Sequence, residues 1–180
     1  MEIRTSFRAN YEVEDPFELP SSGRGVLYFP PVSSDRGRTY STRLRFAYVS
    51  QPPWYGVFAT EFDEGVSFVS TMPDPDWTCV AAAGTGYILN VLDPQQWNGV
   101  PVGPVRQLVT AEDHEILLLS CFTRVVSYGK EGQKWITSPL CSDALRVVEI
   151  KGGIIACTGW DAPTDNEVFF NLDIRSGRKR

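Results

Sequence analysis

The stretch from Glu115 to Trp135, EILLLSCFTRVVSYGKEGQKW, constrains most strongly what the chain can fold into. It holds two apolar runs, Ile116–Phe122 and Val125–Tyr128, and then a Lys-Glu-Gly turn before the tryptophan. Short apolar runs bounded by turn residues are typical of buried strands joined by hairpins. No segment of the sequence has the length and the 3.6-residue rhythm of a long helix. The sequence therefore predicts an all-β fold made of antiparallel sheet units.

The pattern of this stretch recurs in the second half of the chain. Trp97 and Trp135 lie 38 residues apart, and so do Ile116 and Ile154, each of which begins an apolar run. A period of about 40 residues holding three or four short strands is typical of a β-propeller blade. We therefore expect one β-domain over residues 1–180, with an N-terminal arm at 1–24 and three sheet units within 77–178. These units would form a partial propeller or a sandwich.

Three stretches, LNVLDPQQW, VVSYGKEGQKW and FFNLDIRSGR, resemble the pyrroloquinoline-quinone-like β-propeller repeats. In those repeats a strand ends near an aspartate, turns at a glycine and often reaches a tryptophan. The last stretch departs from this pattern because it has no terminal tryptophan. The resemblance covers residues 77–178 and implies blade-like sheets. It implies no cofactor, since no cofactor motif accompanies these stretches, and we expect none.

The first half of the chain also reads as short strands and turns. Gly25–Phe29 ends at two prolines, and Thr42–Val49 alternates apolar residues with arginines, the pattern of a half-buried strand. The Ser- and Gly-containing segment Ser33–Tyr40 predicts a loop. We expect Tyr55–Phe62 and Val66–Ser70 to form a hairpin around the turn that separates them.

Charge and hydropathy exclude several classes of protein. The net charge is −5 at pH 7, so no overall positive field would draw the chain to nucleic acid. The chain does hold two clusters of basic residues, which we expect to be solvated: Arg36, Arg38, Arg43 and Arg45, and Arg175, Arg178, Lys179 and Arg180. Neither a secretory signal pattern nor an apolar run of roughly 18 residues is present. We therefore expect a soluble, cytoplasmic protein that binds neither membrane nor nucleic acid.

The cysteine pattern argues against disulfides and structural metals. The chain has four cysteines, Cys79, Cys121, Cys141 and Cys157, and no two have CxxC spacing. Three of them lie in runs of apolar or small residues, where a thiol behaves as a small hydrophobe. We expect reduced, buried cysteines and no metal site.

His114 is the only histidine, so any histidine-dependent catalysis must use it. Its candidate partners are a carboxylate, Asp113 or Asp143, and a thiol, Cys121 or Cys141. A small hydrolase or transferase is therefore one alternative. Cys121 follows a run of leucines, however, and a thiolate in a core is poorly solvated. We accordingly favour a function without catalysis.

Tryptophans near proline, glycine or aspartate are the strongest binding signal in the sequence. On loops, such rings offer a large rigid area for a carbohydrate, another small molecule or a partner protein, although each ring could instead plug the end of its own sheet. The residues predicted to form the site are Trp54, Trp77, Trp160, Arg43, Asp161 and Asp165. We predict a non-catalytic binding or protein-interaction module that recognises an unknown ligand on one rim of the sheets. An immunity or antagonist protein for a basic partner is a further alternative, based on the acidic composition.

Overall fold

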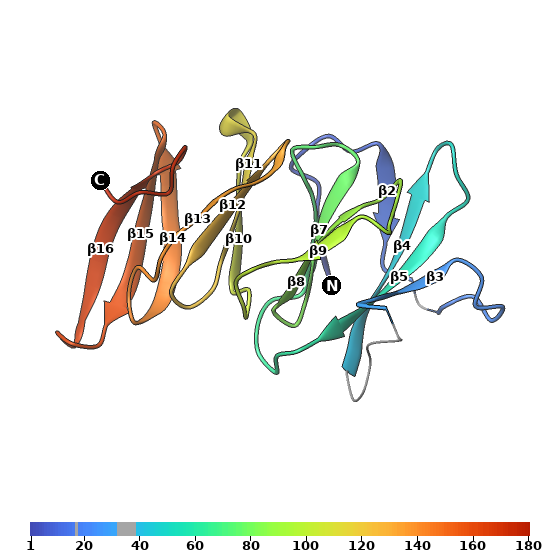
Figure 1. Cartoon of the computed structure of the whole chain (residues 1–180), viewed down its shortest axis with the longest axis horizontal. Helices are drawn as coiled ribbons and strands as arrows, with labels where there is room; N and C mark the ends of the chain where they lie inside the picture. The colour runs from blue at the N-terminus through green and yellow to red at the C-terminus, as the bar shows by residue number, and fades with distance from the viewer. Residues whose placement is uncertain (17, 32–38) are drawn as a thin grey trace. The chain divides into compact units, whose positions relative to one another are not determined.

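The computed structural model describes residues 1–16, 18–31 and 39–180 (Figure 1). These residues divide into two compact units, Met1–Val100 and Pro101–Arg180. The described residues form strands and a single 3₁₀ turn, Glu112–His114, with no α-helix among them, so the all-β prediction is confirmed. None of the described segments is a helix that is long and apolar enough to cross a bilayer. Most of the predicted 33–40 loop, including Arg36 and Arg38, lies outside the described residues.

The N-terminal unit contains a five-stranded sheet. Its strands, in spatial order, are β1 (Glu2–Arg4), β6 (Phe68–Thr71), β7 (Trp77–Ala82), β8 (Thr85–Asn90) and β9 (Trp97–Gly99). Strands β6 to β9 form an antiparallel meander, and β1 joins its edge parallel to β6.

The second sheet of this unit has four strands. In spatial order they are β2 (Tyr11–Glu14), β4 (Thr39–Tyr48), β5 (Trp54–Thr60) and β3 (Val26–Phe29). Leu44 and Phe46 of β4 are buried, whereas Arg43 is exposed and Arg45 is half-buried, as the alternation predicts. The strands predicted at 25–29 and 42–49 are therefore confirmed.

The predicted hairpin between Tyr55–Phe62 and Val66–Ser70 is wrong. Strand β5 pairs with β4 on one edge and with β3 on the other, whereas β6 pairs with β1 and β7 in the other sheet. Because both edges of β5 are occupied, β6 cannot pair with it. The Asp-Glu-Gly segment between them connects two sheets. Its composition suits a connection between sheets as well as a hairpin turn.

Residues 1–24, expected as an arm, contribute to both sheets of the N-terminal unit. Strand β1 extends one sheet and β2 the other. Side chains from both sheets form one core that is rich in aromatic rings. Phe46 stacks on Trp54 with ring centroids 4.5 Å apart, and Phe29 stacks on Phe58 at 4.9 Å. Stacked rings of this kind add to the stabilisation that burial provides.

The C-terminal unit contains two antiparallel sheets. The first is a meander of β10 (Gln107–Ala111), β11 (Ile116–Ser120), β12 (Val125–Gly129) and β13 (Gly132–Ile136). The second is formed by β14 (Asp143–Lys151), β15 (Ile154–Asp161) and β16 (Asn166–Asp173), which lie side by side in Figure 1. The hairpin predicted around the central stretch is confirmed, with Lys130 and Glu131 at its second turn. Trp135 lies within β13.

The same tryptophan hydrogen bond occurs in each unit. The Trp54 indole donates to the carbonyl of Val91, 37 residues later, at 3.0 Å. The Trp135 indole donates to the carbonyl of Ile174, 39 residues later, at 2.9 Å. Both acceptors immediately follow a strand of the neighbouring sheet in the same unit. Each bond satisfies a buried donor and joins two sheets.

Candidate functional site: the outer face of the C-terminal sheet

The structure separates the predicted binding residues into two groups. Trp54, Trp77 and Arg43 belong to the N-terminal unit, whereas Trp160, Asp161 and Asp165 belong to the C-terminal unit. Trp54 is not on a surface loop as predicted: its side chain is buried in the core, where the indole has the bond to Val91. Trp77 is half-buried at the start of β7, and Arg43 is exposed on β4.

Trp160, Asp161 and Asp165 lie together at one end of the β14–β16 sheet. Trp160 and Asp161 end β15, and Asp165 belongs to the turn that leads into β16. The hydroxyl of Thr164 donates to Asp161 Oδ2 at 2.7 Å, so the turn between the two strands is closed by its own side chains. The Trp160 side chain is 38% exposed.

Sequence reasoning missed the most exposed aromatic residue of this sheet, Phe169, which is 74% exposed. It is paired across the strands with Thr158, while Trp160 is paired with Glu167, so Trp160 and Phe169 are diagonal neighbours on one face. Its signal was available, because Phe169 is the aromatic residue on the otherwise polar register of β16. Its neighbour Phe170 points the other way and packs against the core.

Val148 belongs to the same face of this sheet. It lies where the register of β14 shifts between Val147 and Glu149, and it is 64% exposed. Val147 beside it is buried in the core. We call the surface formed by Val148, Trp160 and Phe169 the outer face. Apolar side chains at this exposure on one sheet are a feature of interaction surfaces.

The two edges of this sheet differ in how they are covered. On the β14 edge, the Gln107 side-chain amide donates to the Val147 carbonyl and accepts from the Val147 amide, both at 2.9 Å. On the β16 edge, the backbone of Lys179 forms an isolated antiparallel β-bridge with Leu172, and the Arg180 amide donates to the Asn171 carbonyl at 3.0 Å. No strand of the described chain pairs with this edge at residues 166–170.

Opposite charges gather at the two ends of β16. Asp161, Asp165 and Glu167 lie at its start. At its end the Arg180 guanidinium binds the Asp173 carboxylate and holds the pKa of Asp173 below its ordinary value. The open part of the edge is therefore the acidic part.

The structure does not bring His114 to its predicted thiol partners. His114 and Asp113 lie in the exposed 3₁₀ turn before β11, and Cys121 follows the far end of that strand. At roughly 3.3 Å per residue, the five residues of β11 alone separate them by about 15 Å. This is far beyond hydrogen-bonding distance.

Cys141 and Asp143 lie at the same end as Cys121. The Cys141 thiol contacts the carbonyl of Phe122 at 3.8 Å and that of Asp143 at 3.2 Å. All four cysteines are free, and three are buried, with Cys141 half-buried. Burial raises the pKa of Cys157 to about 12 and also raises that of Cys141, so neither is an activated thiolate at neutral pH. Among the described residues no group of acidic, histidine and cysteine side chains is arranged to hold a metal.

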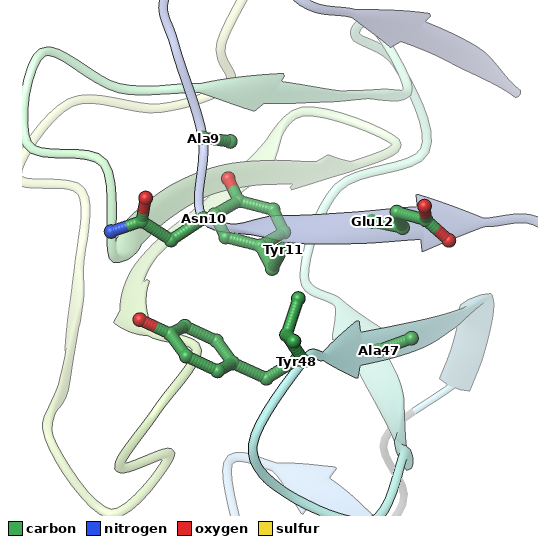
Figure 2. A pocket seen from close by; sticks show the side chains of 7 residues that line it. Ala9, Asn10, Tyr11, Glu12, Ala47 and Tyr48 are labelled. Atoms are coloured by element: carbon green, nitrogen blue, oxygen red, sulfur yellow. The ribbon is translucent and has the colours of Figure 1, made fainter.

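The N-terminal unit has an open hollow of about 600 Å³ over the paired ends of β2 and β4, lined by Ala9–Glu12 and Ala47–Val49 (Figure 2). Asn10 Nδ2 and the Tyr48 hydroxyl both donate to Asp76 Oδ1 at 2.8 Å. The bond to Asp76 raises the pKa of Tyr48, because it holds the phenolic proton beside a negative charge. These polar groups are already paired with one another, so the hollow is a weaker candidate than the outer face.

The fold and this surface define an all-β protein of two units, with antiparallel meanders and an exposed aromatic face on its last sheet. Comparison with known proteins takes the identification no further: no protein-family model matches the chain, and no curated protein matches its sequence.

Proposed function

We propose that the chain is a non-catalytic protein-interaction module that binds its partner through the outer face. The observation that supports this most is Phe169, an aromatic ring 74% exposed next to Trp160 on the same sheet face. Exposed aromatic rings supply large contact area at low entropic cost and are enriched among the residues that dominate binding energy. A hydrolase or transferase is not favoured, because His114 and the thiols lie at opposite ends of β11.

The proposal includes blade-like packing of the sheets within each unit. Successive meanders joined by a tryptophan hydrogen bond, as between Trp135 and Ile174, support the resemblance to propeller repeats. In such an array the outer face would be the free face of a blade.

The test compares two serine substitutions at exposed apolar residues. Phe169→Ser removes the most exposed ring of the outer face, and Val49→Ser removes an even more exposed apolar side chain, at 99%, from the other unit. Each purified variant is immobilised and challenged with extract from the native source, and captured proteins are quantified by mass spectrometry. We expect a protein captured by the wild type and by Val49→Ser to fall at least about fivefold with Phe169→Ser. Equal capture by all three proteins would refute the proposal.

A further inference from the structure

We propose that the open edge of β16, residues 166–170, binds an extended basic segment of a partner protein, which adds to the sheet as a further strand. This inference rests on the proposed function and specifies the chemistry of the partner. In strand addition the backbone hydrogen bonds supply affinity, and alternate side chains supply specificity.

The register of β16 identifies which backbone groups face outward. The Ile174 amide donates to the Gly153 carbonyl at 3.0 Å, so even-numbered residues of β16 bond to β15. The backbone N–H and C=O groups of the odd-numbered residues point away from β15 toward the open edge, as the bond from the Arg180 amide to the Asn171 carbonyl demonstrates. The outward N–H and C=O groups of Glu167 and Phe169 are therefore directed toward an incoming strand.

The other sheet edges among the described residues are shorter or protected. Strand β9 has three residues, and β3 has four and is followed by Pro30. Strand β13 has a register shift with its partner and presents the exposed Lys134, and β14 is covered by the Gln107 amide. Short strands, bulges and lysines are the usual means of preventing edge pairing. Strand β16 has eight residues and a regular register throughout.

The side chains beside the open edge select for positive charge. An added strand would place alternate residues on the outer face, next to Glu167 and Phe169. A lysine or arginine there can pair with the carboxylate and contact the ring face, as Lys179 does with Phe170 at 4.7 Å. Asp161 and Asp165 at the adjacent turn add negative potential. The remaining residues of the added strand would face the half-buried Val168 and Phe170 and should be apolar.

The probe is an acetylated, amidated peptide that alternates lysine and valine over six residues. Titrated into ¹⁵N-labelled protein, it should produce saturable shifts centred on the amide signals of Glu167 and Phe169, and should slow their hydrogen exchange. Two control peptides test the mode of binding. One replaces every lysine with glutamate, and the other places a proline in its centre. Neither should shift these signals.

Two variants of Glu167 separate charge from backbone pairing. Glu167→Lys reverses the charge and should weaken the peptide at least about tenfold, whereas the matched Glu149→Lys on β14 should change affinity less than about threefold. Glu167→Pro removes an outward N–H that β15 does not use, and should abolish the slowed exchange at Phe169 while retaining the spectrum of a folded sheet.

The inference would be overturned by the absence of saturable shifts at Glu167 and Phe169, or by equal weakening in the two charge-reversed variants. If the peptide does not bind but Phe169→Ser still loses a captured protein, strand addition fails while the proposed function stands. If the peptide binds and capture is unchanged by Phe169→Ser, the proposed function fails instead.

Discussion

At the scale of single residues, two glycines in left-handed turns of the C-terminal unit form a matched pair. Gly177 has a φ of +66°, and an added Cβ would lie 2.5 Å from Cε3 of Trp135. Gly152 has a φ of +56° and no atom within 4 Å of that position. Alanine at either site incurs left-handed strain of about 1–2 kcal/mol, but only Gly177→Ala adds a clash, at about 1–3 kcal/mol.

We therefore expect Gly177→Ala to lower the free energy of unfolding by about 2–5 kcal/mol and Gly152→Ala by about 1–2 kcal/mol. Urea unfolding followed by fluorescence measures both values. An equal loss in the two variants would mean that the Trp135 ring can move aside without cost.

Asp76 controls the titration of Tyr48. Since the hydrogen bond and the negative charge both favour the protonated phenol, Asp76→Asn should move the pKa of Tyr48 downward, toward its ordinary value. The ring-carbon NMR signal of Tyr48, assigned with Tyr48→Phe, reports this titration. Asp74→Asn is the control, because Asp74 accepts from the Asp76 amide and has no bond to the phenol. An unchanged Tyr48 titration in Asp76→Asn would contradict the assigned bond.

At the scale of elements, the hydrogen bonds of Trp54 and Trp135 join the two sheets of each unit, and we expect them to contribute to stability. Trp135→Phe keeps an aromatic ring but leaves the Ile174 carbonyl without its donor, which should cost about 1–3 kcal/mol. Trp54→Phe should cost a similar amount through Val91. In Trp97→Phe only ring contacts with Phe29 and Tyr87 change, so its cost should be smaller. Thermal and urea unfolding of the three variants gives the comparison, and a cost for Trp97→Phe as large as the others would show that ring size alone matters.

The faces of strands could be predicted from sequence, but their partners could not. Alternation placed Leu44 and Phe46 inside because the period of two is a local property of any strand. The hairpin predicted after β5 failed because pairing depends on which edges are already occupied, and β3 occupies one of them. Trp54 was expected on a loop because two prolines precede it. Its indole is instead buried and donates to the Val91 carbonyl, 37 residues further along the chain, which no local pattern indicates.

At the scale of the whole molecule, composition and periodicity were enough to predict an all-β chain with short antiparallel strands. The division after Val100 was not predicted, because the repeat expected within residues 77–178 runs across it. The candidate site was predicted in part: Trp160, Asp161 and Asp165 do come together, whereas the more exposed ring, Phe169, was not among the predicted residues.

The pairing of Lys179 and Arg180 with β16 has a practical consequence for anyone who produces this protein. That pairing is antiparallel, so a peptide fused after Arg180 would run back along the strand toward Phe169 and Glu167. A histidine or epitope tag placed there would act as an intramolecular competitor at high effective concentration. A purification handle attached there should therefore be cleaved before any search for a partner.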